Sequence, residues 1–465
     1  MIAPLPQSDE RQPLLSSTTA ATATTEAGLK RSVWYRARRS PFAVACVVAM
    51  ALFTDMVVYG VVVPILPDIV KSRLGGTPRE VGLLFACYAI GLLASTPVFA
   101  IMSDKYQNRR IPMMLGMLGL AVATVGFSLA SNYWVLILAR IGQGSAGGAS
   151  WTIGLGLLAD VYPPDNLGVV MGATMTANAV GFMLGPMVGG YLYEYHGYSA
   201  PFIFCAGLAV LDFMCIVFIA EPEKKKVAAV QVDQDEGAAS TAIEQEVDYL
   251  TVHEPSTTTV VAIASNWTIT CCLLATFVAA SVFSGLEPIL PLYLEELLGA
   301  GPTQTGLIFL AAIFPTLFSS AIGYYADKVG HFYISLLGMA IFAVATFSLS
   351  MPKTFLSFIL PLALFGLGSS TILTPLLPAM ADVVNKKGWN GYAKTYALYN
   401  MTYSLSMAVG PILAGFIFED FGFWWTMVMF GIMIVVATPV IFTAQIAQVF
   451  AQWRGASRTS DAINA

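Results

Sequence analysis

The sequence predicts an all-α membrane protein with twelve transmembrane helices in two pseudo-symmetric six-helix bundles. Three observations predict this fold: the composition, the number of apolar stretches, and an internal repeat. Hydrophobic residues make up 57% of the 465-residue chain, and charged residues make up only 11%. A soluble chain carries about 25% charged residues, so this chain has too little charge to cover a water-exposed surface. A net charge of −5 also excludes the basic footprint of a nucleic-acid-binding protein.

Twelve stretches are long enough to cross a bilayer, which needs about 20 mostly apolar residues. In chain order they are 42–70, 81–102, 111–130, 133–158, 168–193, 200–220, 270–298, 304–325, 332–350, 355–382, 392–416 and 422–445. Residues 1–40 are polar and rich in Ser, Thr and Ala, without a cleavable signal peptide. We therefore expect a disordered cytoplasmic tail there, and the first helix itself serves as the insertion signal.

One long polar segment, 221–268, divides the stretches into six and six. It is acidic and cannot bury a core, so we expect a disordered cytoplasmic linker. The domains are then an N-terminal bundle at 41–220 and a C-terminal bundle at 269–446, followed by a cytoplasmic tail at 447–465. With both termini in the cytoplasm, the inside segments hold 18 of the 23 Lys and Arg residues and the outside segments hold 4. The excess of positive charge inside supports this orientation.

The two halves repeat each other. Pro64-Ile-Leu-Pro67 recurs 224 residues later as Pro288-Ile-Leu-Pro291. The other matches have nearly the same offset: Gly82 with Gly306, Asp104-Lys105 with Asp327-Lys328, and Gly185-Pro186 with Gly410-Pro411. Four ordered matches indicate a duplication. Six-helix halves with a site at their interface, near the middle of the bilayer, are a known transporter plan.

Acidic residues inside the apolar stretches are the main candidates for function, because burying a charge in the membrane is costly. Asp55 lies near the middle of the first stretch and Glu287 near the middle of the seventh, which are equivalent in the repeat. We interpret them as proton- or cation-binding residues; the alternative is an acid that stays protonated and bonded to a neighbouring helix. Asp212 in the sixth stretch is a weaker candidate for the same pathway.

Arg140 is the one Lys or Arg residue in the interior of a stretch. It is a candidate partner for the proton site, and the alternative is an interfacial anchor that snorkels. Acids with almost no bases favour a cationic or neutral substrate. Aromatic rings can hold an ammonium group by cation–π attraction. The candidates to line a cavity are Tyr59, Tyr88, Asn178, Tyr399, Asn400 and Tyr403.

Several short motifs are candidates for gating. Ser103 to Arg110 is a charged loop in which Asp104, Arg109 and Arg110 can form contacts that break when the halves move. Its counterpart in the second half contains Asp327. The Gly142–Gly148 run, with Gly144, and the Gly181–Gly190 run, with Gly185 and Pro186, favour close helix packing or a kink. Close packing and gating are the two alternative roles of these residues.

The sequence gives no sign of enzyme chemistry. The six cysteines lie in or beside apolar stretches without a metal-binding spacing, so we expect neither a metal site nor disulfides. There is no phosphate-binding loop of the ATPase type. We expect no cofactor, with the proton as the coupling ion.

These motifs resemble the major facilitator superfamily over nearly the whole chain. Asp104 to Arg110 looks like that superfamily's loop 2–3 signature, although glycines are usual where Ala100 and Gln107 stand. Arg140-Ile-Gly-Gln-Gly144 looks like the signature tied to proton coupling, and Gly181 to Gly190 looks like the antiporter signature. Within the superfamily the chain is most similar to the drug:proton antiporter branch that includes the vesicular amine transporters, through Asp55 with Val61 to Pro67, Leu286 to Pro291, and Leu157 to Gly172.

The sequence also departs from that branch. Where the vesicular amine transporters have a lysine in the second membrane stretch, this chain has Tyr88. Where they have acids in the tenth and eleventh stretches, this chain has Ser370 and Asn400. The loop between the first two stretches is short, whereas animal vesicular transporters carry a long one. The resemblance therefore implies a fungal relative rather than a neurotransmitter transporter.

The sequence predicts a secondary transporter, monomeric, in the plasma membrane or a vacuolar or vesicular membrane. It would exchange protons for an amine, an organic cation or a drug-like molecule by alternating access. One alternative is a facilitator or proton symporter of a neutral metabolite. Another is a transporter-like receptor, which the short C-terminal tail of about 20 residues disfavours.

Overall fold

The structure is a computed structural model that describes residues 40–106, 109–219, 260–389 and 392–463. Of 103–106, 164–165, 392–393 and 444–463 it describes the backbone alone. The expected N-terminal tail up to residue 39, and residues 221–259 of the expected linker, lie outside the described ranges. Helices and short connections make up all of the described chain.

The N-terminal half begins with a broken crossing. Its helix α3 (Pro41–Val62) stops before Pro64, and a short α4 (Leu66–Asp68) and a π-helical turn η1 (Ile69–Arg73) complete the crossing. Pro64 lacks the N–H that would continue the helix, which permits a break here but does not force one, because α12 runs through the equivalent prolines. The remaining helices are α5 (Pro78–Tyr106), α6 (Arg110–Ser128), α7 (Tyr133–Val161), α8 (Pro164–His196) and α9 (Ala200–Phe218).

The C-terminal half has the same plan with different breaks. Its first crossing, α12 (Trp267–Leu298), runs unbroken through Pro288 and Pro291. The next crossing changes to a 3₁₀ turn in the middle, and α18 bends at Gly422, which has a positive φ of 80°. The elements are α11 (Val260–Ala264), α12, α13 (Pro302–Ile313), η2 (Phe314–Phe318), α14 (Ser319–Val329), α15 (His331–Ser348), α16 (Phe355–Leu373), α17 (Leu376–Lys386) and α18 (Tyr392–Ile463).

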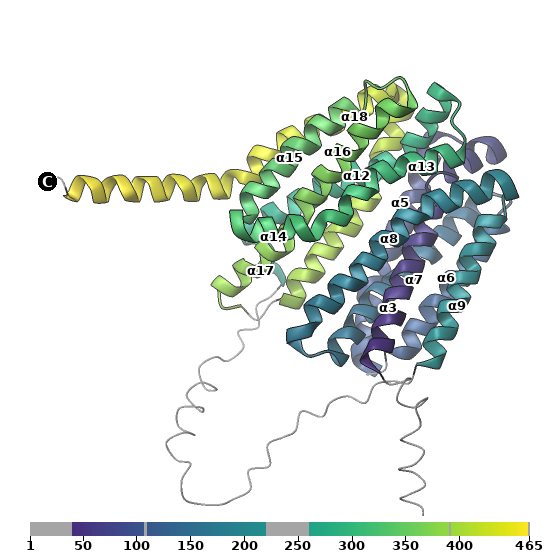
Figure 1. Cartoon of the computed structure of the whole chain (residues 1–465), viewed down its shortest axis with the longest axis horizontal. Coiled ribbons are helices and arrows are strands. Elements are labelled where there is room, and N and C mark those ends of the chain that lie inside the picture. Colours follow the sequence, from purple (N-terminus) through teal and green to yellow (C-terminus); the bar gives the residue numbers. More distant parts are fainter. Residues whose placement is uncertain (1–39, 107–108, 220–259, 390–391, 464–465) are drawn as a thin grey trace, which may run out of the picture.

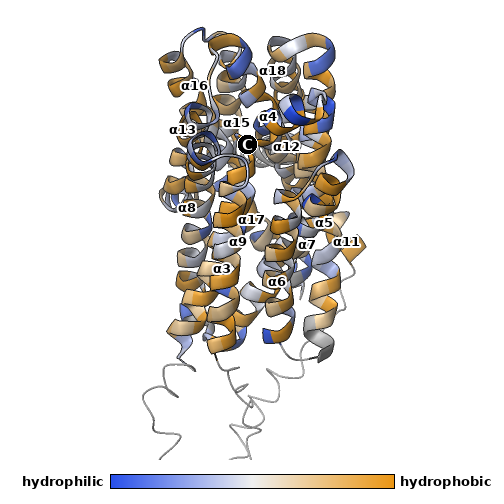
Figure 2. Cartoon of the chain, turned by 90° about the vertical axis from the view of Figure 1, so that its right-hand side faces the viewer, coloured by the Kyte–Doolittle hydropathy of each residue, from blue (hydrophilic) through white to orange (hydrophobic). Residues whose placement is uncertain are grey.

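Twelve crossings account for the described helices other than α11. Ten segments are long and apolar enough to span a membrane. One of them, in α18, contains two crossings because it bends at Gly422, and α7 adds another with 29 residues. The expected all-α fold with twelve helices is therefore confirmed. Figure 2 shows apolar residues along most of the bundle's length, as a lipid-facing surface requires.

The boundaries at the two ends of the C-terminal bundle differ from the expected ones. Helix α11 lies inside the expected linker, and α12 begins at Trp267 rather than after 268, because the Asn266 side chain accepts hydrogen bonds from the N–H groups of Thr268 and Ile269. Such a cap satisfies the first turn of a helix. At the other end, α18 continues to Ile463, through the segment expected to be a tail.

The two halves lie side by side (Figure 1), with α5 against α18 and α8 against α13. We call the end of the bundle at which α3, α6 and α12 begin the N-terminal face. We call the end at which α5, α7 and α13 begin the far face.

The repeated motifs form the seam between the halves. A Cβ on Gly82 would lie 2.2 Å from the carbonyl oxygen of Pro411, and a Cβ on Gly306 would lie 2.2 Å from that of Pro186. A second symmetric pair of close contacts lies further along the same helices. A Cβ on Gly190 would meet the carbonyl oxygen of Pro302, and a Cβ on Gly415 would meet that of Pro78. Only glycine lets the backbones approach so closely. The repeat seen in the sequence is thus a structural pseudo-symmetry.

Candidate functional site

Asp55 lies in the interior of the N-terminal half, on α3, with 1% of its surface exposed. The hydroxyl of Tyr88 on α5 lies 3.3 and 3.4 Å from its two carboxyl oxygens. A Cβ on Gly147 of α7 would lie 2.8 Å from Asp55 Oδ1, so the glycine leaves room for the carboxyl group. Three helices therefore enclose this acid.

Glu287 lies on α12, the counterpart of α3 in the other half, and is 3% exposed. The hydroxyl of Tyr59, one turn along α3 from Asp55, donates a hydrogen bond to its carboxyl oxygen Oε2. This bond crosses from one half to the other. The ring of Tyr59 lies 4.8 Å from that of Tyr88, centroid to centroid, so two neighbouring tyrosines link the second acid to the first.

Arg140 completes the cluster from α7, fully buried. Its guanidinium lies over three rings, 5.7 Å from the centroid of Tyr59 and 5.3 Å from those of Phe85 and Tyr88. One nitrogen donates to Gln143, whose amide donates to Thr124. Nε and Nη2 have no hydrogen-bond partner among the described residues. The aromatic rings attract the cation but do not neutralise it.

We call Asp55, Tyr59, Tyr88, Arg140 and Glu287 the central cluster. It holds two acids, one permanent cation and two hydroxyl groups, all buried. Carboxyl groups beside hydroxyl donors can bind and release protons, and an ionised carboxylate beside Tyr rings can bind an ammonium group.

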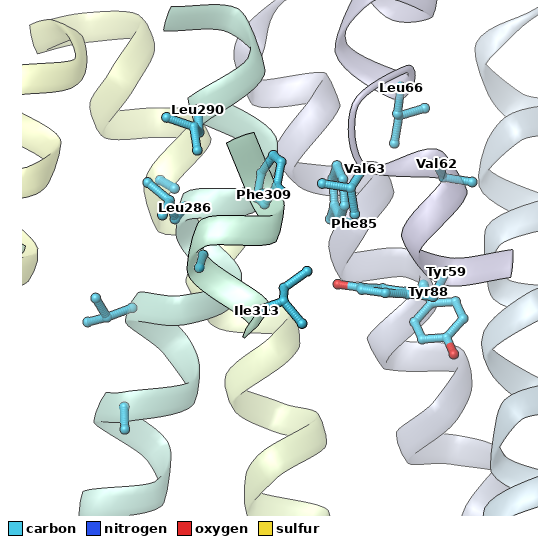
Figure 3. Close-up of a cluster of buried hydrophobic side chains, with 14 of the residues drawn as sticks. Tyr59, Val62, Val63, Leu66, Phe85, Tyr88, Leu286, Leu290, Phe309 and Ile313 are labelled. Atoms are coloured by element: carbon cyan, nitrogen blue, oxygen red, sulfur yellow. The ribbon is translucent and has the colours of Figure 1, made fainter. Parts of the chain in front are cut away.

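Apolar side chains separate the central cluster from the far face. Figure 3 shows most of a group of apolar side chains from both halves above Tyr59 and Tyr88, with Ile313 beside them. The group, which we call the plug, has almost no exposed surface; its members are Val62, Val63, Leu66, Phe85, Leu286, Leu290, Phe309 and Ile313. Water and ions cross such a layer poorly, so the plug closes the site toward the far face.

Ion pairs reinforce this closure. Arg79 on α5 pairs with Glu419 and Asp420 on α18, with 3.2 Å between its Nε and Glu419 Oε1. Lys71 Nζ lies 3.0 Å from Glu295 Oε1 on α12. The Glu194 carboxylate accepts from the N–H of Thr303 at the start of α13 at 3.0 Å, where the helix dipole favours an anion. All these contacts join the two halves at the far face.

Replacing Arg79 by Ala is therefore expected to favour opening of the far face. Exposed ion pairs each contribute about 0.2–1 kcal/mol, so the loss of two pairs is worth about 1 kcal/mol, or about a fivefold change in population. The measurement is the maleimide labelling rate of a single cysteine at Leu290 in the plug, in a background lacking the native cysteines. Lys353→Ala, which removes an exposed cation outside these pairs, is the control. Equal labelling rates in both variants would show that the pairs do not hold the face closed.

The structure leaves other candidates outside the central cluster. Asp212 is buried on α9, and neither of its carboxyl oxygens has a hydrogen-bond partner among the described residues. That helix packs on α6, α3 and α8. The Asn178 side chain donates to the carbonyl of Leu52 at 3.3 Å and so joins α8 to α3. On α18, Tyr399 stacks on Tyr403 with 6.5 Å between ring centroids, and Asn400 is exposed.

The charged gating candidates make ion pairs or backbone contacts, and the glycine candidates lie where helices pack closely. Arg109 pairs with Asp160 of α7, and Arg110 donates to the carbonyls of Ile216 and Val217 at the end of α9. Asp327 is exposed and lies 4.0 Å from His331 of α15. The side chain of Asp104 lies outside the described residues.

The glycine motifs lie at close helix contacts. A Cβ on Gly144 would lie 1.9 Å from the carbonyl oxygen of Tyr88, and a Cβ on Gly185 would lie 2.8 Å from the Cα of Gly60. Pro186 belongs to the seam.

Sequence reasoning missed three parts of this site. Phe85 supplies one ring around Arg140, and Gln143 lies three residues after Arg140 on the same helix face, a spacing that could have indicated the contact. The ion pairs of Arg79 join helices whose pairing the sequence does not specify.

The fold and the central cluster define a polytopic membrane transporter built from two repeats around a buried ionisable site. The chain belongs to the Major Facilitator Superfamily, whose family model matches residues 48–388 and 272–454. This confirms the resemblance inferred from the sequence. It makes the chain a multi-pass integral membrane protein that binds small-molecule substrates within a lipid bilayer.

Two known proteins are similar to this chain in sequence, and one solved structure is similar to it in fold. An uncharacterized MFS-type transporter of Schizosaccharomyces pombe is 30% identical over 437 residues, which cover 85% of this chain and 93% of that protein. The synaptic vesicular amine transporter of Mus musculus is 29% identical over 78% of this chain and 66% of its own length. A bacterial homologue of the human lysosomal transporter Spinster, in an inward-facing and unoccupied conformation, has a TM-score of 0.68 at 13% identity, covering 87% and 96% of the two chains. At that identity it shows the fold alone.

Proposed function

We propose that the chain is a proton-coupled antiporter that exchanges protons for an amine or another organic cation, including drug-like cations. The observation that carries this proposal is the central cluster, in which Tyr59 and Tyr88, whose ring centroids lie 4.8 Å apart, donate to Glu287 of one half and Asp55 of the other. Glu287 contacts both halves through its bond from Tyr59, so its protonation affects how they pack. The similarity to vesicular amine transporters supports an amine as the substrate.

Transport then follows from alternating access. With the far face closed by the plug and the ion pairs, the site exchanges with the N-terminal face. A cation displaces the proton from the acids, the halves rock, and the far face opens. Protons arriving from that side release the cation and reset the site. The protein acts alone as a monomer, without a cofactor and without enzymatic chemistry.

The N-terminal face is the cytoplasmic side in this proposal, because the described positive charges expected inside, Arg109, Arg110, Lys328, Lys386 and Lys387, lie at that face. Exchange against an acidic compartment then concentrates the cation in a vacuole or vesicle. In the plasma membrane the same cycle would export a drug.

The experiment is transport by the purified chain in sealed liposomes with an acidic lumen, using a panel of amines, cationic drugs and neutral metabolites. We expect uphill accumulation of cations that a protonophore collapses. Equilibration that ignores the pH gradient would instead indicate a facilitator, and entry of a neutral metabolite together with protons would indicate a symporter.

A further inference from the structure

We infer that the central cluster exchanges one proton for one singly charged cation, so that each transport cycle moves no net charge. This inference rests on the proposed antiport function. It adds the charge of the substrate and the stoichiometry of the exchange.

The central cluster has one more acid than it has bases. Asp55 and Glu287 are the two acids of the cluster, and Arg140 is its one base. The arginine stays protonated in proteins. The titratable groups that face these three from the surrounding helices are Tyr59 of α3, Tyr88 and Cys87 of α5, and Tyr403 of α18. All four are neutral hydroxyl or thiol groups, so they leave the count unchanged.

The buried charge of Arg140 needs an opposite charge nearby. The guanidinium is fully buried, and two of its nitrogens lack a hydrogen-bond partner among the described residues. A buried charge is costly unless an opposite charge balances it. One ionised carboxyl group supplies that balance, and the other acid then holds a proton. The resting cluster is therefore neutral with one proton bound.

A bound cationic substrate changes the charge balance of the cluster. A cation with one charge restores neutrality only if the second acid also ionises, so its binding releases one proton. Tyr59 and Tyr88 donate to the two carboxyl groups and can stabilise both as carboxylates. A cation with two charges would leave one positive charge unbalanced. Asp212 does not enter the count, because it lies on α9, where neither oxygen has a hydrogen-bond partner among the described residues.

The test compares two flat probes of similar shape with fixed charges: 1-methyl-4-phenylpyridinium, with one charge, and methyl viologen, with two. The purified full chain in weakly buffered detergent solution is titrated with each probe while a pH dye records proton release. We expect about one proton released per methylphenylpyridinium bound, and much weaker binding of methyl viologen. In liposomes, a pH gradient should drive methylphenylpyridinium uptake, and a potassium–valinomycin potential alone should not.

Variants at Arg140 sharpen the test. Arg140→Gln leaves two acids without a base, so this cluster should hold two protons and release two when methyl viologen binds. Arg140→Lys keeps the charge and should keep the ratio of one proton to one methylphenylpyridinium, even if binding weakens. Size-exclusion profiles show whether each variant is folded, and the wild-type ratio tests the inference if a variant is not.

The outcomes separate the two proposals. A wild-type ratio near zero or two, or methylphenylpyridinium uptake that follows the imposed potential, would overturn the inference while leaving antiport in place. Absence of pH-driven uptake and of binding for every cation would overturn the proposed function and this inference together.

Discussion

Replacing Glu287 by Gln is expected to reduce uptake driven by a pH gradient to the level of protein-free liposomes. The amide keeps the size of the side chain and can still accept from Tyr59, but it cannot bind or release a proton. The remaining acid, Asp55, then balances Arg140 permanently, so no carboxylate is available for a cation. Asp55→Asn should have the same effect for the same reason. The measurement is initial uptake of a cation that the wild-type protein accumulates.

Asp212→Asn is the matched control, because it makes the same acid-to-amide change at a buried position outside the central cluster. It should retain pH-driven uptake. Thermal unfolding of the three purified variants shows whether any loss of transport reflects misfolding. Uphill transport at the wild-type rate in both cluster variants would remove these acids from the proton pathway.

The double variant Gly82→Ala with Gly306→Ala is expected to destabilise the state in which the far face is closed. Each added Cβ would lie 2.2 Å from a carbonyl oxygen of the opposite half. Overpacking costs about 1–3 kcal/mol per site, which corresponds to at least about a fivefold shift per site toward states in which the halves separate there. Labelling of a cysteine at Leu290 should accelerate accordingly, and transport should slow because the cycle needs both states.

Gly119→Ala on α6 is the control for this double variant, since no atom lies within 4 Å of the added Cβ. Alanine is the better helix former, so this control should label and transport like the wild type. Labelling of the double variant at the wild-type rate would show that the seam relaxes around a methyl group and does not limit opening.

The sequence was sufficient to predict the fold, because the apolar stretches that predict membrane helices are local features of the chain. A bilayer needs a stretch of apolar residues at each crossing, and the composition together with the twelve stretches met that requirement. The repeated Gly and Pro motifs also indicated the two related halves. The helix ends were less accurate where a side chain decided them, as Asn266 does at the start of α12.

The acids were also recognisable from the sequence, since a charge in an apolar stretch is rarely tolerated without a purpose. Their neighbours were less predictable. An apolar helix has no polar face to fix its rotation, so the sequence could not show that Tyr59 reaches Glu287 while Asn178 turns to the backbone of α3. The sequence also could not show that Asp212 lies outside the central cluster, which contains the other two acids.

The sequence by itself thus determined that the chain spans a membrane twelve times, in two repeats with few internal charges. Those properties depend on solvation and on the order of residues along the chain. Only the tertiary structure decided that Asp55, Glu287 and Arg140 lie in one cluster, and that the plug and the pairs of Arg79 close the far face. Contacts between α3 and α12, or between α5 and α18, join residues more than 200 positions apart, and they depend on how helices rotate and pack against each other.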